Sequence, residues 1–183
     1  MPPQDLERAL TQLRKSGYGA RIAEHIAQGR FDSLPGYYGK EGLLFQCKQK
    51  GMLPAVHQAM EFAADLQKRG VDDLAFEEKL PDKGLDLDVL VKSGEDIKYG
   101  CQLKDVDHES GISSAAKKIA KKGLDGAISG PKVAILDVHD TRAALTEATV
   151  KAVEHFAKRT EATFELRFDD GSVTIPPNGQ IYP

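Results

Sequence analysis

Hydrophobic positions in the first 70 residues follow the spacing of helices. Apolar side chains recur every three or four positions in three stretches, which predicts helices over residues 5–15, around Ile22, and over residues 52–69. After the second helix the pattern is interrupted by Pro35, Gly36, Gly39 and Gly42, so we interpret that stretch as a loop or linker before a separate core. The expected organisation is a helical appendage over residues 1–50, followed by a separate domain over residues 51–183.

Strand patterns dominate from residue 74 onward. The expected strands are residues 74–80, 85–91, 97–104 and 132–138 and a hairpin of 163–168 with 172–175, and the expected helices are 111–122 and 142–158. The fold class that follows is α/β. Its core is one helix, three strands, a helix and a strand in a mixed sheet flanked by helices, with the small helical appendage before it.

Two neighbouring strands carry polar residues in matching phase. Asp86 and Asp88 alternate with aliphatic residues in the first, and Gln102 and Lys104 do so in the second. A slip of one residue would set each apolar row against a polar one, so the apolar faces must coincide. With a loop of residues 94–96, Asp88 falls opposite Gln102, and Asp86 falls opposite Lys104.

The strand before them adds further charges. Its apolar residues should face the core, which turns Glu77 and Lys79 toward the two aspartates and points Glu78 at the core. A charge facing the core is unfavourable, and a bulge would exchange Glu77 for Glu78. Glu77 is therefore the expected accessory acid, with Glu78 as the alternative.

Carboxylate and amide oxygens gathered on one strand face suit a hard cation such as Mg²⁺. A metal ion there could polarise a phosphoryl oxygen, and Lys104 could orient water or stabilise developing negative charge. The alternative is an exposed strand face that carries solvated charges. The helices expected on both sides of the sheet favour a sheltered site, where unpaired acids are costly.

The runs Gly84–Val91 and Tyr99–Lys104, and the order of elements over residues 52–138, resemble the PD-(D/E)xK, or restriction-endonuclease-like, nuclease superfamily. The resemblance covers about half of the chain. The chain departs from the family pattern in two ways: it has no proline before Asp88, and Gln102 stands where an acid is commoner. The second departure removes a negative charge and should weaken metal binding.

The resemblance implies a role for each residue of the motif. Asp88 would bind the metal, Gln102 would be the second ligand, and Lys104 would be the catalytic lysine. Asp86 would be an additional acid, and either Glu61 or Glu77 would be an accessory carboxylate. The implied cofactor is Mg²⁺, with Mn²⁺ or Zn²⁺ as alternatives.

A second match to the motif lies near the N-terminus. Asp32 precedes Gln46 and Lys48 at the same distance. Pro35 and the glycines that follow it deny Asp32 an apolar strand, so we prefer the later pair.

Four lysines, Lys117, Lys118, Lys121 and Lys122, lie within two turns of the helix expected after the Gln102 strand. Their basic face should flank the acid cluster and contact phosphates of a nucleic acid. The alternative is a solubilising helix face. Ser113 and Ser114, at the start of the same helix, are expected to cap it.

The formal net charge of −3 argues against a protein that simply coats nucleic acid, but it allows a nuclease with a local basic patch. Cys47 and Cys101 are too few for a disulfide framework or a cysteine-rich zinc site, although one disulfide between them is possible. We expect no signal peptide and no membrane span, and hence a soluble protein that acts in the cytoplasm.

The function expected from the sequence is metal-dependent endonuclease activity on DNA or on RNA such as tRNA. The size, the helical appendage and the tail also resemble nuclease toxin modules at the C-termini of bacterial competition proteins. That resemblance implies delivery into a target cell's cytoplasm and a cognate acidic immunity protein. The alternative is a non-catalytic protein with a nuclease fold that serves as a binding module, an immunity protein or an adaptor.

Overall fold

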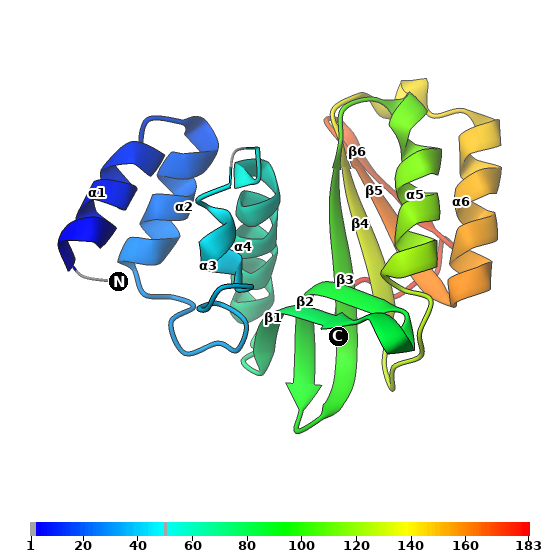
Figure 1. Ribbon diagram of the computed structural model, residues 1–183. Helices are drawn as coiled ribbons and strands as arrows, with labels where there is room; N and C mark the ends of the chain where they lie inside the picture. The colour runs from blue at the N-terminus through cyan, green and yellow to red at the C-terminus, as the bar shows by residue number, and fades with distance from the viewer. Residues whose placement is uncertain (1–2, 50) are drawn as a thin grey trace. The chain divides into compact units, whose positions relative to one another are not determined.

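The computed structural model describes residues 3–49 and 51–183. The chain separates into two compact units, an N-terminal unit that ends at Asp72 and a C-terminal unit, Asp73–Pro183 (Figure 1). Within the part of the chain that is described, no helix is both long and apolar enough to cross a bilayer. Cys47 and Cys101 are free thiols in different units, so the possible disulfide is not formed.

The N-terminal unit is helical. It comprises α1 (Pro3–Leu13), α2 (Gly17–Ala27), α3 (Leu43–Gln46) and α4 (Leu53–Lys68). Helix α4 has the predicted bounds to within one residue, and its expected apolar face is buried: Val56, Ala59, Met60, Ala63 and Leu66. It contacts α2 and α3, and it belongs to the N-terminal unit. This grouping differs from the boundary at residue 50 that the sequence suggested.

The stretch interpreted as a linker is part of the core of the N-terminal unit. Phe31, Tyr37 and Leu43 in this stretch are buried, and the rings of Phe31 and Tyr37 lie 5.9 Å apart in an edge-on arrangement. Gly36 and Gly39 adopt positive φ angles that allow the tight turns between these anchors. Proline and glycine therefore mark turns inside a packed loop here, which agrees with the loop alternative and not with a separate linker.

The C-terminal unit is a six-stranded mixed sheet with the strands in sequence order. The strands are β1 (Leu74–Leu80), β2 (Leu85–Ser93), β3 (Asp96–Val106), β4 (Lys132–Val138), β5 (Ala162–Phe168) and β6 (Gly171–Ile175). The pairs β1–β2, β2–β3 and β5–β6 are antiparallel, whereas β3–β4 and β4–β5 are parallel. The predicted mixed α/β class and the C-terminal hairpin are confirmed.

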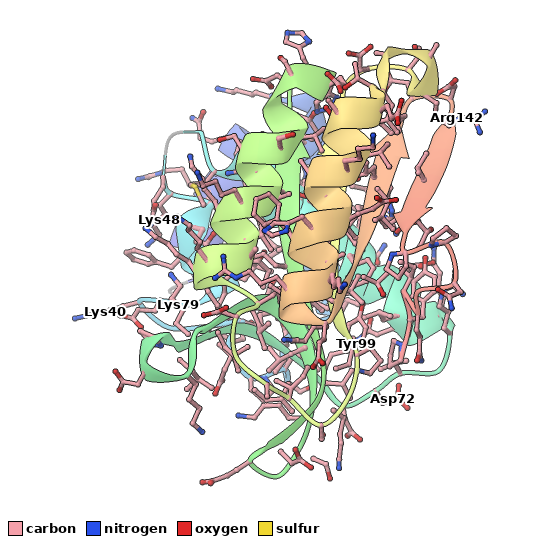
Figure 2. All side chains as sticks on the ribbon, turned by 90° about the vertical axis from the view of Figure 1, so that its right-hand side faces the viewer. Lys40, Lys48, Asp72, Lys79, Tyr99 and Arg142 are labelled. Atoms are coloured by element: carbon pink, nitrogen blue, oxygen red, sulfur yellow. The ribbon has the colours of Figure 1, made fainter. Side chains whose placement is uncertain are left out.

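Two helices, α5 (Ile112–Lys122) and α6 (Glu147–Thr160), lie side by side across one face of this sheet (Figure 2). They bury Ile119 and Val153 in one apolar cluster with Leu136, Phe164 and Leu166 of the strands. Short 3-10 turns complete the unit: η1 (Pro81–Lys83), η2 (Glu109–Gly111) and η3 (Arg142–Ala144).

Helix α6 begins later than the sequence predicted. Thr146 caps it, because the backbone N–H of Thr149 donates to Thr146 Oγ1 at 3.2 Å. The residues from Arg142 to Ala144 form the separate turn η3 and not the first turn of α6.

Candidate active site

The register of β2 and β3 agrees with the hydrophobic pattern. Val89 pairs with Cys101, and Val91 pairs with Tyr99. The loop between β2 and β3 is one residue shorter than the predicted 94–96, because Asp96 pairs with Ser93. A bulge between Val91 and Lys92 compensates, so the apolar rows align as expected.

Strand β2 separates from β3 on the N-terminal side of Val89, so residues Leu85–Asp88 do not pair with β3. The ladder does not continue to Asp86 and Lys104, so the predicted pairing of these two residues in the sheet was wrong. Instead, the backbone N–H of Asp86 donates to Gly123 O at 3.0 Å, and Leu85 bridges to Leu124. The residues that follow α5 therefore take the place beside β2 that β3 has vacated.

Asp88 lies at the point where the two strands separate. Its Oδ2 accepts the backbone N–H of Leu103 at 2.6 Å and the side-chain amide Nε2 of Gln102 at 2.9 Å. The Asp88 carboxylate thus accepts the Leu103 N–H of β3 at a place where the regular β2–β3 ladder has already ended. The predicted adjacency of Asp88 and Gln102 is confirmed.

The other end of the Gln102 amide faces the end of α5. A Cβ at Gly123 would lie 2.7 Å from Gln102 Oε1, so only glycine leaves room for the amide in this position. Sequence reasoning missed Gly123. Its one visible signal was its place directly after Lys122, which is the usual position of a glycine that ends a helix.

Electrostatics at Asp88 favour a neutral or cation-bound carboxyl group. Burial raises the pKa of Asp88 to about 8, the Leu103 hydrogen bond opposes the rise, Glu77 and Asp86 add to it, and Lys79 counteracts it. Lys79 pairs directly with Asp86 in the β1–β2 ladder. The sequence therefore predicted correctly that these charges would gather around Asp88.

Strand β1 is distorted at Glu77. This residue is half-buried and has a φ of 55°, and the β1–β2 pairing is interrupted there, between Phe76↔Val89 and Glu78↔Leu87. Glu78 is half-buried, and Lys92 Nζ donates to its Oε1 at 3.2 Å, so its charge is paired. The register is the same on both sides of Glu77, so no bulge exchanges the two glutamates, and the ion pair resolves the conflict that the sequence pattern showed.

Two other carboxylates considered from the sequence have their partners in the N-terminal unit. Glu61 Oε1 accepts Arg21 Nε at 2.6 Å and lies 2.7 Å from His25 Nε2. Asp32 accepts the Tyr38 hydroxyl at 2.8 Å, and Gln46 ends helix α3 and not a strand. The second motif match therefore lacks the paired strands that the chemistry requires.

Lysines line the outer side of the β3–α5 region. Lys104 is exposed on β3, and the four lysines of α5 are exposed as well. Lys104 and Lys118 both border a hollow at the start of α5. Ser113 and Ser114 do not cap α5, because Gly111 occupies the N-cap position and no side chain hydrogen-bonds to the cap.

The donors for a hard cation at this place are the Asp88 carboxylate and the Gln102 amide, near the negative charges of Glu77 and Asp86. Among residues 3–49 and 51–183, no three His, Cys, Asp or Glu side chains are arranged to hold a metal ion. Comparison of the chain with models of protein families, with curated proteins and with solved structures finds no match.

Proposed function

We propose that the C-terminal unit is a metal-dependent endonuclease that hydrolyses phosphodiester bonds of DNA or RNA at Asp88, Gln102 and Lys104. One observation carries the proposal: a half-buried carboxylate with a strongly raised pKa is held by two hydrogen bonds where two strands part. Perturbed carboxylates in such surroundings are typical of functional sites.

The chemistry of the donors fits a divalent cation. The raised pKa means that the negative charge of Asp88, beside Glu77 and Asp86, is unfavourable unless a proton or a cation balances it. Asp88 and Gln102 are the residues that would hold the ion. Gln102 donates its Nε2 to Asp88 and turns its Oε1 toward Gly123 here, so its amide would rotate to give the oxygen to the ion. When bound, Mg²⁺, Mn²⁺ or Zn²⁺ supplies Lewis acidity and lowers the pKa of a coordinated water.

The chain's own residues supply the remaining functions. Lys104 follows Gln102 by two positions on β3, so its ammonium group is on the same side of the strand and can stabilise negative charge developing on a phosphoryl oxygen. The exposed Lys117, Lys121 and Lys122 of α5 can contact backbone phosphates and position the strand. Asp86 and Glu77 tune the charge around Asp88.

From the resemblance in the sequence we also propose that the sheet and helices of the C-terminal unit form a restriction-endonuclease-like core, and that the protein is a toxin effector of bacterial competition. A cognate immunity protein would then block the basic face, and the cytoplasm of the target cell would be the place of action.

The test is cleavage of plasmid DNA and of tRNA with Mg²⁺ or Mn²⁺, in the presence and absence of a chelator. Asp88→Ala and Lys104→Ala should each lower the rate by about a hundredfold or more, because each removes a group that acts on the reacting phosphate. Lys158→Ala removes an exposed lysine of α6 and is the matched control, with an unchanged rate. Equal cleavage by the wild type and Asp88→Ala would remove the basis of the proposal.

A second function is a non-catalytic binding module with the same fold. The hydrogen bond from Gln102 Nε2 to Asp88 favours it, because the amide satisfies the carboxylate without a metal. Calorimetric titration with Mn²⁺ separates the two functions. The endonuclease predicts binding heat that Asp88→Asn abolishes, whereas the binding module predicts no heat that depends on Asp88.

A further inference from the structure

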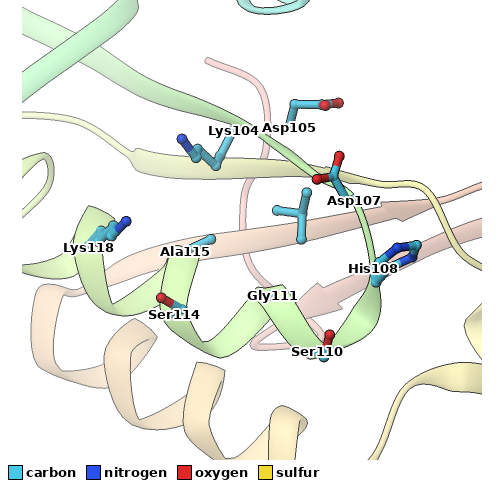
Figure 3. Close-up of a pocket in the computed structure, with 10 residues that line it drawn as sticks. Lys104, Asp105, Asp107, His108, Ser110, Gly111, Ser114, Ala115 and Lys118 are labelled. Carbon is cyan, nitrogen blue, oxygen red and sulfur yellow. The ribbon is translucent and has the colours of Figure 1, made fainter.

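A hollow of about 340 Å³ opens where β3 ends and α5 begins (Figure 3). Its polar lining comprises Lys104, Asp107, His108, Ser110, Ser114 and Lys118. The volume is near the lower end of the range of roughly 300–1,000 Å³ for small-molecule sites, which suits a single nucleotide. Neither Asp88 nor Gln102 lines the hollow, but Lys104 does, so the hollow adjoins the proposed reaction centre and shares Lys104 with it.

The hollow has a basic end and an acidic end. Figure 3 shows Lys104, on β3, and Lys118, on α5, toward the left side of the hollow, and Asp107 and His108 toward the right side. Asp105, which also borders the hollow, lies 2.6 Å from His139 Nε2, and its hydrogen bond raises the pKa of that imidazole. Asp107 forms no ion pair among the described residues, although its charge also contributes to the raised pKa of His139.

We propose that this hollow seats one ribonucleotide of the substrate strand, with its phosphate between Lys104 and Lys118 and its 2′-hydroxyl on Asp107. Two ammonium groups with the Ser114 hydroxyl alongside suit a phosphate. A carboxylate repels a phosphodiester but accepts a hydrogen bond from a hydroxyl group. The 2′-hydroxyl is the group by which a protein distinguishes RNA from DNA.

This inference rests on the proposed function and narrows its substrate to RNA. It also assigns different tasks to lysines that the sequence pattern could not separate. Lys118 contacts a particular phosphate within the hollow, whereas Lys117 and Lys121 do not line it. A base amino group could also reach Asp107, but in that case DNA and RNA would bind equally, which the experiment below detects.

The experiment measures binding of short single strands of adenosine or deoxyadenosine nucleotides to the full chain by fluorescence anisotropy, with a chelator present to prevent hydrolysis. The wild type should bind the ribose strand about tenfold more tightly, the effect of one hydrogen bond to a charged group. Lys118→Ala should weaken binding of both strands about tenfold. Lys158→Ala, which removes the same charge from α6, should change neither by more than about twofold.

Asp107→Ala tests the acidic end. Removing its negative charge can strengthen binding of both strands, so the readout is the ratio of the two affinities, which should fall to about one. Asp107 and Lys118 are both exposed, so neither change should disturb folding. Equal affinities for the two strands in the wild type, or an unchanged ratio in Asp107→Ala, would overturn the inference.

The binding and cleavage experiments test the two proposals separately. Ribose-selective binding without any hydrolysis in Mg²⁺ would refute the endonuclease activity but not the ribonucleotide site. Hydrolysis that depends on Asp88, without ribose selectivity, would refute the ribonucleotide site alone.

Discussion

The Asp88 carboxyl group experiences two opposing effects. Hydrogen bonds from Leu103 and Gln102 stabilise its charged form, while burial and the nearby Glu77 and Asp86 stabilise its neutral form, and the second effect prevails. The hydrophobic pattern predicted which residues meet at this place. It could not predict whether the pKa of Asp88 is raised or lowered, because that depends on how far the carboxyl group is buried.

Stability should therefore depend on pH through Asp88. Because its folded-state pKa is about 8, the folded protein keeps this proton as the pH rises from about 4, whereas the unfolded chain releases it. The contribution of Asp88 to the free energy of unfolding is thus present below about pH 4 and is lost progressively up to about pH 8.

Asp88→Asn removes this titration and keeps an oxygen that accepts both hydrogen bonds. We expect the variant to exceed the wild type in stability by a margin that grows from about pH 4 to about pH 8, at up to about 1.4 kcal/mol for each pH unit. Urea unfolding of both proteins across this range measures the margin. A margin that is constant with pH would show that Asp88 ionises normally.

The end of α5 shapes the site through its contacts with β2 and with Gln102 of β3. Strand β2 separates from β3 because residues after α5 pair with it, through Gly123 and Leu124. These residues lie far along the chain from the motif, and no local pattern connects them to it. The strand bounds were predictable from the hydrophobic pattern, most closely for β1 and β4, whereas this separation of β2 from β3 was not.

Gly123→Ala tests that contact. Gly123 has a φ of −103°, which alanine adopts freely, so the new methyl group acts mainly on Gln102 Oε1, 2.7 Å away. We expect the amide to be displaced from Asp88, a cleavage rate lower by about tenfold or more, and a stability change within about 1 kcal/mol. Gly17→Ala, where a Cβ meets open space, is the control. Unchanged cleavage would mean that the position of Gln102 does not matter.

At the scale of the whole molecule, charge is distributed unevenly. The chain carries a formal net charge of −3, yet α5 presents four lysines within two turns on its exposed face. Net charge alone therefore does not show this local basic patch. The sequence showed this patch correctly, because helical spacing determines which side chains share a face.

Salt dependence reports whether this patch binds a strand. Lys122→Ala should flatten the slope of log K against log salt by about 0.7 for a single strand, since one fewer counterion is released. Lys158→Ala on α6 should leave the slope unchanged. If the two variants lower the slope equally, the binding reflects general charge and not the α5 face.

Titration of the Asp88 carboxyl carbon by NMR, with and without Mg²⁺, shows directly whether this carboxyl group is perturbed and binds a metal ion. We expect a pKa of about 8 in the absence of metal. With saturating Mg²⁺ we expect the pKa to fall by several pH units, because a bound cation stabilises the carboxylate. A pKa near the ordinary value of about 4, or a raised pKa that Mg²⁺ leaves unchanged, would refute a metal site at Asp88.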